Sequence, residues 1–364
     1  MKPGRKVLSI ILVALMIGTI GAMSVSFTGC SKKSSVIKIA MLPKFKGENY
    51  FDAVKTGAQS AIDELNKDGK KVEFLYDGPP QDQATNQEQV NILEGWMAQK
   101  VSVILVSCDD QTAIAPTLKK AMSQGIKVVT FDADAEAGAR DLFVNQATAA
   151  GIAQGLLTGA AAQLKTKGYG PSNPVNLAVV SSAKTDANQQ AWLGAIKTLL
   201  ATSDYSWIKI KNEQTDVYYP GPDETTTQNM SGTVISRMGV GADKIQLAIG
   251  LTSMAGPALA SQYQAASVKP DVSKVVMEGV ATPDGLKSYI KDDTNPMKVG
   301  VLWNCMDLGY LSVQTGYQLF QKTITDSSTS ITAGKLGQKD IVEKQIVLGP
   351  TLIFDKTNVD SFNY

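Results

Sequence analysis

The chain has 364 residues, carries 35 lysines and arginines against 34 aspartates and glutamates, and contains no histidine. The absence of histidine excludes Ser-His-Asp and Cys-His nucleophilic systems and every metal site that needs an imidazole ligand. The near-zero net charge gives no electrostatic argument for a nucleic-acid partner.

The first 35 residues have the pattern of an export signal. Three basic residues precede an apolar run over residues 7–22, and small residues then lead to Cys30. The segment that ends at this cysteine resembles the lipobox of bacterial lipoproteins, in which the cysteine is acylated. We therefore predict a signal peptide over residues 1–29 and a lipidated tether over 30–35, which would hold the protein at the outer face of the cell membrane. The alternative is a plain signal peptide, or an uncleaved anchor helix, with an incidental cysteine.

From residue 36 onward, short β-rich runs alternate with stretches whose apolar residues recur at helical spacing. The nearly continuous apolar runs are typical of strands that are buried on both faces of a parallel sheet. A cluster of glycine, proline and polar residues at 167–174 interrupts the alternation, which then restarts. The expected strands are residues 36–42, 72–76, 101–107, 126–131 and 142–144 before this break, and 175–180, 207–210, 245–249, 275–278 and 299–303 after it.

Repeated β-α units predict doubly wound parallel sheets, and two blocks of such units predict two Rossmann-like α/β lobes joined by a hinge. We expect an N-terminal lobe over residues 36–170 and a C-terminal lobe over residues 171–304. The segment from about 305 to 364 would return to complete the N-terminal lobe. Because ligands of open α/β sheets bind beyond the carboxyl ends of the strands, we expect the binding site in the cleft between the lobes.

Polar and aromatic residues follow several of the expected strands, in a combination that suits a small polyol. Carboxylates accept hydroxyl hydrogens, amides both donate and accept, and lysine offers a charge-assisted donor. Aromatic faces cover the apolar side of a sugar ring and exclude water. The candidate ligand-binding residues are Lys44, Tyr50, Phe51, Phe131, Asp132, Asn188, Gln189, Leu251, Ser253, Trp303 and Asn304.

Other motifs are weaker. The acidic pairs Asp109-Asp110 and Asp292-Asp293 lack the spacing of a metal-binding loop and are more typical of solvated turns. Two cysteines that follow Cys30 in the chain are predicted to be buried small residues rather than a disulfide framework. No glycine-rich phosphate loop follows a strand. We therefore expect no catalytic residue, no metal and no cofactor.

In these residues the chain resembles the type I periplasmic sugar-binding proteins of ABC importers. It is most similar to the autoinducer-2-binding receptors and their rhamnose-binding relatives, from about residue 36 to the C-terminus. The stretches that carry the resemblance are IAMLPK at 39–44, YDGP at 76–79, ILVS at 104–107, AMSQGIK at 121–127, FDAD at 131–134, VNQ at 144–146 and IFDKTNVD at 353–360.

The resemblance implies a role for each candidate residue. In that family a lysine after the first strand and an aspartate after the fourth bind the ligand, and these match Lys44 and Asp132. An Asp-Gln pair of the second lobe falls on Asn188 and Gln189, so that its carboxylate has become an amide. The other matches are Leu251 and Ser253 for backbone contacts, Tyr50, Phe51, Phe131 and Trp303 for aromatic walls, and Asn304 where the family has an aspartate.

The family implies a monomeric solute receptor that closes by a hinge around one small hydroxylated ligand and docks to an ABC permease. The ligand would be autoinducer-2 or a monosaccharide such as rhamnose or a pentose. The alternative is a sensor input for chemotaxis or signalling, which shares the fold. A sugar-responsive transcription regulator would need a DNA-binding unit where this chain has its export signal, and the missing histidine argues against a surface enzyme.

Overall fold

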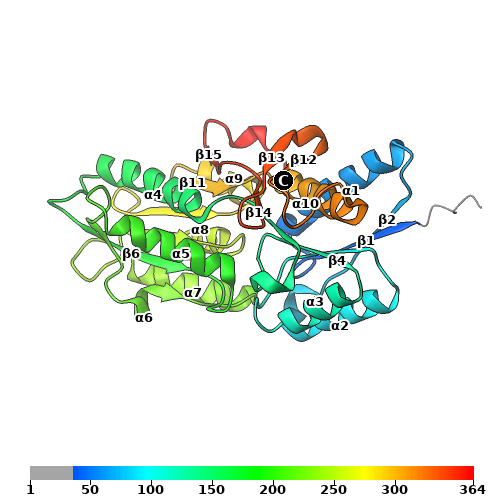
Figure 1. Cartoon of the computed structure of the whole chain (residues 1–364). Helices are drawn as coiled ribbons and strands as arrows, with labels where there is room; N and C mark the ends of the chain where they lie inside the picture. The colour runs from blue at the N-terminus through cyan, green and yellow to red at the C-terminus, as the bar shows by residue number, and fades with distance from the viewer. Residues whose placement is uncertain (1–35) are drawn as a thin grey trace, which may run out of the picture. The chain divides into compact units, whose positions relative to one another are not determined.

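The computed structural model describes residues 36–364, which form one compact unit. The signal peptide, the tether and the acylated Cys30 that the sequence predicts lie outside the described residues. Within the unit, two large sheets are each flanked by helices (Figure 1). In this part of the chain no helix has the length and apolar character needed to cross a membrane.

The first sheet has six parallel strands in the order β14-β5-β4-β3-β1-β2. Its strands are β1 (Ile37–Leu42), β2 (Val72–Tyr76), β3 (Val103–Val106), β4 (Lys127–Phe131), β5 (Leu142–Asn145) and β14 (Gln345–Val347). Ile39 and Met41 of β1 lie in one apolar core with residues of α1 (Asn49–Lys67) and α10 (Cys305–Gln321). Ala40 and Leu42 point to the opposite core, which α2 (Asn86–Ala98) and α3 (Ala115–Ser123) cover.

The second sheet follows the order β15-β11-β10-β9-β6-β7, with the short β8 (Val217–Tyr218) also paired to β6. Its strands are β6 (Val175–Val180), β7 (Ile208–Lys209), β9 (Leu247–Gly250), β10 (Val276–Val280), β11 (Met297–Leu302) and the antiparallel β15 (Leu352–Asp355). The helices that belong to it are α4 (Ala149–Thr166), α5 (Ala187–Leu200), α6 (Glu213–Asp216), α7 (Glu224–Arg237), α8 (Ala255–Ala265) and α9 (Pro283–Lys291). A separate hairpin joins β12 (Ser330–Thr332) to β13 (Gln338–Asp340).

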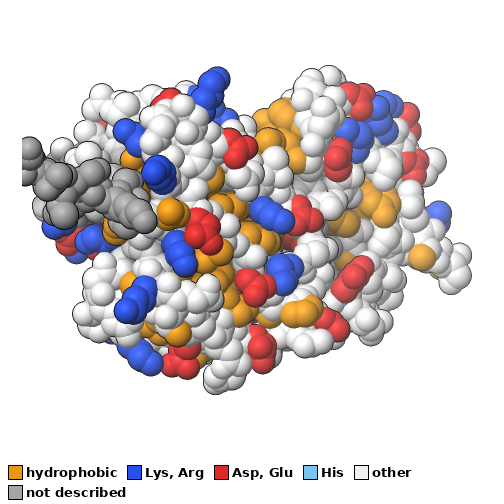
Figure 2. Space-filling view, turned by 90° about the vertical axis from the view of Figure 1, so that its right-hand side faces the viewer, with side chains coloured by type: hydrophobic (Ala, Val, Ile, Leu, Met, Phe, Trp, Pro, Cys, Tyr) orange, Lys and Arg blue, Asp and Glu red, His pale blue; other side chains and the backbone are white. Residues whose placement is uncertain are grey.

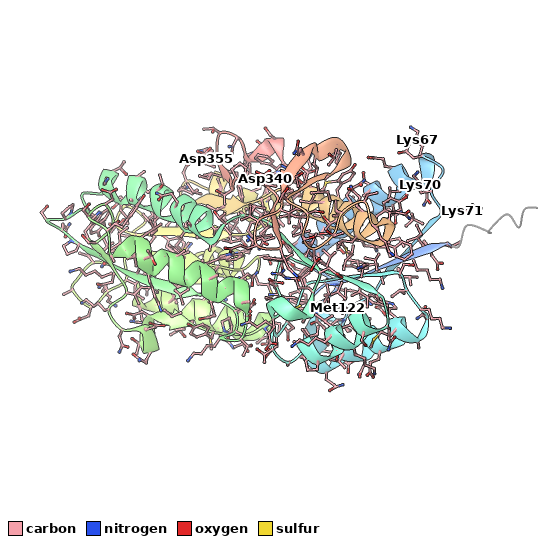
Figure 3. All side chains as sticks on the ribbon, in the orientation of Figure 1. Lys67, Lys70, Lys71, Met122, Asp340 and Asp355 are labelled. Atoms are coloured by element: carbon pink, nitrogen blue, oxygen red, sulfur yellow. The ribbon has the colours of Figure 1, made fainter. Side chains whose placement is uncertain are left out.

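Both sheets share one topology, because in each the first strand lies between the second and the third. The chain order therefore reverses between β1 and β3, and again between β6 and β9, and such switch points are where open α/β sheets bind ligands. Figure 3 shows Lys67 at the end of α1 and Lys70 and Lys71 before β2, all at the end of the first lobe that is remote from the second. The carboxyl ends of the first sheet consequently point toward the second lobe. The predicted fold of two doubly wound lobes is confirmed.

The chain passes between the two sheets three times: from β5 to α4, from β11 to α10, and from β14 to β15. The sequence analysis assigned both α4 and the whole segment after about residue 305 to the first lobe. In the structure α4 packs on β10 and β11, and β15 pairs with β11. We therefore propose lobe boundaries at residues 146–148, 303–304 and 348–351, in place of the expected boundary near 170. The turn cluster at 167–174 lies inside the second lobe because it only ends α4.

Helices α1 and α10 cross with their backbones in contact. A Cβ atom on Gly57 would lie 1.7 Å from the carbonyl oxygen of Met306, and one on Gly309 would lie 1.9 Å from the carbonyl oxygen of Val54. Only glycine permits this approach at both positions. The crossing holds the first turn of α1, which carries Tyr50, against the chain that enters α10 from the second lobe.

Glu278 lies in the middle of β10 and is completely buried. Its Oε1 accepts a hydrogen bond from Nε2 of Gln163 at 2.8 Å, and its Oε2 has no partner among the described residues. Burial raises the pKa of Glu278 well above its ordinary value. The folded state therefore keeps this carboxyl protonated, while the unfolded chain releases the proton above the ordinary pKa. Stability is lost as the pH rises from the ordinary toward the folded pKa.

We predict that Glu278→Gln raises the unfolding temperature at pH 8 and that the gain shrinks toward pH 4, because an amide carries no titration penalty. Each kcal/mol recovered corresponds to about 2 °C in a chain of this size. The measurement is thermal unfolding by circular dichroism between pH 4 and pH 8, with the exposed Glu224→Gln as the control. A gain that does not change with pH would contradict the assignment of a buried neutral carboxyl.

Candidate functional site

A cavity of about 70 Å³ lies where the carboxyl ends of the two sheets face each other. This volume exceeds the roughly 10–15 Å³ that a cavity needs to hold one water molecule, so the cavity is open to solvent or to a small ligand group. Its walls come from the segments that follow β1, β3 and β4 in the first lobe and β6, β9 and β11 in the second. The polar residues that line it are Lys44, Asp109, Asp132, Ser182, Asp186, Asn188, Gln189, Thr252 and Ser253.

An ion pair crosses this cavity from one lobe to the other. Nζ of Lys44, just after β1, donates to both carboxylate oxygens of Asp186 at 2.8 and 2.9 Å. Both side chains are buried. Burial alone would lower the pKa of Lys44, but the facing carboxylates, with that of Asp186 first, outweigh burial and raise it. The lysine is therefore a cation in this cleft.

Asp186 stands at the N-cap of α5, where an aspartate normally accepts a backbone N–H of the first turn. It makes no such capping bond, because both of its oxygens accept from Lys44. The carboxylate nevertheless lies at the positive end of the α5 dipole, which favours its charge. The start of α5 thus places the carboxylate of Asp186 at the cleft, where it pairs with Lys44 of the other lobe.

Asp132 follows β4 in a left-handed backbone conformation, with φ of 59°. A residue with a Cβ adopts this conformation at a cost of about 1 kcal/mol, and such outliers are frequent at functional sites. Oδ1 of Asp132 accepts from the hydroxyl of Tyr50 at 2.9 Å and Oδ2 from that of Ser107 at 2.7 Å. Nε2 of Gln146 donates to Oδ1 at 3.3 Å. Burial raises the pKa of Asp132, and Lys44 and the hydroxyl donors counteract this only in part.

Aromatic rings form the apolar wall of the cavity and meet edge to face. The ring centroids of Tyr50 and Trp303 lie 5.8 Å apart, and those of Trp303 and Trp192 lie 5.6 Å apart. Nε1 of Trp303 also donates to the hydroxyl of Tyr50 at 3.1 Å. Trp303 follows the last parallel strand of the second sheet, so the wall joins the two lobes. Phe45 and Phe51 continue it in the first lobe.

The cavity carries more negative than positive charge. One lysine and three aspartates line it, which is a formal excess of two negative charges. The third carboxylate is that of Asp109, after β3, and burial followed by the charges of Asp186 and Asp110 raises its pKa against the opposing effect of Lys44. An anion would therefore enter the cavity against the field, whereas a donor of hydrogen bonds would find acceptors. No group of three or more potential metal ligands occurs in residues 36–364.

Nine of the eleven residues that the sequence analysis proposed line this cavity. Phe131 and Asn304 do not. Phe131 is the last residue of β4 and is completely buried in the core, because the chain turns toward the cleft only at the next residue. Asn304 is exposed and caps α10, accepting the backbone N–H of Asp307 at 3.0 Å.

The second-lobe amides have different surroundings. Gln189 donates from Nε2 to the carbonyl of Leu251 at 2.8 Å and accepts from Ser181 at 3.2 Å, so it braces the loop after β9. Asn188 accepts the backbone N–H of Gln189 at 3.0 Å. Two residues before Asn188, the carboxylate of Asp186 lines the cavity and pairs with Lys44.

The sequence analysis did not select Asp109, Asp186 or Trp192. Asp109 belongs to a pair that was interpreted as a solvated turn, and Trp192 lies inside a helix. The position of both residues in the segments that follow strands, Asp109 after β3 and Asp186 between β6 and α5, was the signal that could have found them. Cys108 and Cys305 are free and buried, as expected, and burial raises the pKa of both thiols.

A sequence profile described as the periplasmic binding protein domain matches residues 39–323. Solved structures share the fold. An ABC transporter solute-binding protein from Clostridium phytofermentas with bound L-rhamnose has 25% identity and a TM-score of 0.77, over 90% of this chain and 98% of that one. LsrB from Clostridium saccharobutylicum in complex with AI-2 has 21% identity and a TM-score of 0.78, over 90% and 100%. A solute-binding protein from Burkholderia graminis in complex with D-arabinose has 20% identity and a TM-score of 0.71, over 92% and 100%.

We predict that Asp186→Asn shifts the lobes of the unliganded protein toward the open form. The substitution leaves the ammonium of Lys44 buried without its carboxylate partner, and separation of the lobes returns water to it. Small-angle X-ray scattering should report a larger radius of gyration than for the wild type. Asp77→Asn, which removes the exposed pair of Asp77 with Lys46 inside the first lobe, serves as the control. Identical scattering from the wild type and Asp186→Asn would show that the pair does not hold the lobes together.

Proposed function

The chain belongs to the periplasmic binding protein domain family, and on that premise we propose that it is the extracytoplasmic solute receptor of an ABC importer. It binds one small hydroxylated molecule between its lobes and closes around it by a hinge. The observation that carries this proposal is the cavity between two switch points, crossed by the Lys44–Asp186 pair. Members of the family bind substrates for transporters and are not enzymes.

Lys44 and Asp132 each have hydrogen-bonding capacity left for a ligand. An ammonium has three N–H donors, and Lys44 directs two contacts at Asp186, which leaves one. A carboxylate has about four acceptor sites, and three donors already reach Asp132. One hydroxyl group of a ligand that accepts from Lys44 and donates to Asp132 would satisfy both. The ligand would thereby replace water in a set of groups that are already oriented.

The walls and the charge of the cavity narrow the class of ligand. Tyr50, Phe51, Trp192 and Trp303 offer ring faces and edges to an apolar side, as a sugar ring has. The excess of carboxylates disfavours sugar acids and sugar phosphates, so we propose an uncharged ligand. The solved relatives support this, because their names report L-rhamnose, AI-2 and D-arabinose. We propose that the ligand is a monosaccharide or autoinducer-2. Its hydroxyl groups would donate hydrogen bonds mainly to the carboxylates that line the cavity.

The proposed location and partners follow from the family and from the export signal. We propose that Cys30 carries the lipid anchor, that the protein works as a monomer at the outer face of the cell membrane, and that an ABC permease receives the ligand. On the face drawn in Figure 2, acidic and basic side chains are interspersed rather than gathered by sign. The relatives are described as transporter proteins, which supports the importer over a sensor for chemotaxis or signalling.

We predict that the chain without its signal peptide binds at least one of L-rhamnose, D-arabinose, D-fucose and autoinducer-2, and does not bind D-glucuronate. Asp132→Asn should weaken that binding by about 10- to 100-fold, since hydrogen bonds to a charged group contribute about 1.5–3 kcal/mol. Isothermal titration calorimetry measures both, and mass spectrometry identifies any molecule that co-purifies. Asp77→Asn is the matched control. Failure of all four ligands, or equal affinity of the wild type and Asp132→Asn, would count against the proposed site.

We predict that Cys30→Ser abolishes lipid attachment. Cells that express the full chain are labelled with radioactive palmitate and fractionated. The wild type should carry the label and sediment with membranes, whereas the variant should be unlabelled and leave the membrane fraction. Cys108→Ser, which changes a buried thiol, should behave as the wild type. Equal labelling of the Cys30→Ser variant would place the anchor elsewhere.

A further inference from the structure

Glu48 lies in the loop between β1 and α1 and lines a second crevice between the lobes. The crevice has a volume of about 270 Å³. Its opposite wall comes from the second lobe, including Ser253 and Met254 after β9 and Thr282 before α9. Gln81 of the first lobe closes one side and donates from Nε2 to the sulfur of Met254 at 2.8 Å. The carboxyl of Glu48 is therefore enclosed only while the lobes are together.

The surroundings of this carboxyl are polar or acidic. Its Oε2 is shielded from solvent and has no hydrogen-bond partner in residues 36–364. The hydroxyl of Ser253 and the backbone N–H of Tyr50 lie near the carboxyl and favour its ionised form. The other titratable groups that face it are Asp132 after β4, Asp52 on α1, Tyr76 at the end of β2, Cys305 at the start of α10 and, across the crevice, Glu224 on α7.

All of the charged groups in this set are acids. A carboxylate enclosed without a cation is costly, so the neutral form is favoured. Burial, with smaller contributions from Asp132 and Asp52, raises the pKa of Glu48 to about 7. In an open cleft the same side chain would meet water and keep its ordinary pKa.

We propose that Glu48 links closure of the two lobes to the uptake of one proton. This inference rests on the proposed function, because it assumes that the lobes open and close around a ligand. A neutral carboxyl beside Ser253 then favours closure, and alkaline conditions favour the open form. Glu48 contacts no ligand in this account and acts on affinity through the closed state.

The sign follows from the linkage between proton binding and closure. The closed form keeps the proton up to about pH 7, whereas the open form releases it at the ordinary pKa of a glutamate, so ligand affinity falls as the pH rises through this window. Between pH 6 and pH 8 the apparent Kd should rise about tenfold through this group alone. At pH 6.5, binding should take up about three quarters of a proton.

The test compares the wild type with Glu48→Gln, which keeps the shape of the side chain but cannot ionise, and with Glu224→Gln as the matched control. Calorimetric titrations with L-rhamnose at pH 6, 7 and 8, each in two buffers of different ionisation enthalpy, give the Kd and the proton uptake. We expect the wild type and Glu224→Gln to show the tenfold change and the proton uptake. Glu48→Gln should lack both. The same pH dependence in Glu48→Gln and in the wild type would overturn the proposal.

A second measurement observes the carboxyl directly. The chain is labelled with ¹³C at the glutamate carboxyls, and the Glu48 resonance is assigned by its absence in Glu48→Gln. Saturation with a bound ligand should raise the titration midpoint to about 7 from the lower value of the unliganded, more open chain, and a midpoint that ligand binding leaves unchanged would overturn the proposal. If none of the four ligands binds, the proposed function fails; a midpoint near 7 in the unliganded chain would then leave the enclosed carboxyl standing, and a midpoint between pH 4 and 5 would overturn this inference as well.

Discussion

The buried pair of Lys44 and Asp186 is the interaction on which the arrangement of the site depends. It joins residues 142 positions apart in the chain, one after the first strand of each sheet. Neither group could be buried alone, because an unpaired ammonium or carboxylate in an apolar surrounding is too costly. Together they bring the two switch points within hydrogen-bond distance. The cavity lies among the loops that follow the strands, because these loops, rather than core side chains, occupy the space between the two sheets.

Four carboxyl groups, three of them in buried residues and that of Glu48 shielded at its Oε2 atom, show how the surroundings decide what a carboxyl group does. Asp186 is paired with a cation, and Asp132 accepts three hydrogen bonds beside that same cation. Glu278 has a single amide donor inside the second lobe, and Glu48 has a hydroxyl and a backbone amide at the interface of the lobes. The first pair suits recognition of hydroxyl groups. The glutamates lack a cation, so burial raises the pKa of both, and only the enclosure of Glu48 depends on the position of the lobes.

The expected residues that do line the cavity are mostly those whose place local sequence alone decides. Lys44, Asp132 and Trp303 follow strands directly, and the carboxyl ends of parallel strands must meet at one edge. Phe131 does not line the cavity because the chain enters the cleft only at the left-handed turn of the next residue, which no periodicity reveals. Asn304 proved to be a helix cap, a role that asparagine fills well. Asn188 was selected because the resemblance matched it to the family's aspartate, whereas the role of Asp186 depends on Lys44 in the other lobe, a contact that no local pattern reveals.

The sequence by itself determined the alternation of strands and helices, the two doubly wound sheets and the edge at which the polar residues gather, because apolar periodicity and turn residues act over a few positions. Only the tertiary structure decided which sheet each helix covers. Helix α4 lies on the second sheet although it follows the first in the chain, and β15 returns to pair with β11. The ion pair, the aromatic wall and the enclosure of Glu48 were also decided there. Each joins segments far apart in the chain, and their contact is set by how the two lobes meet rather than by any local pattern.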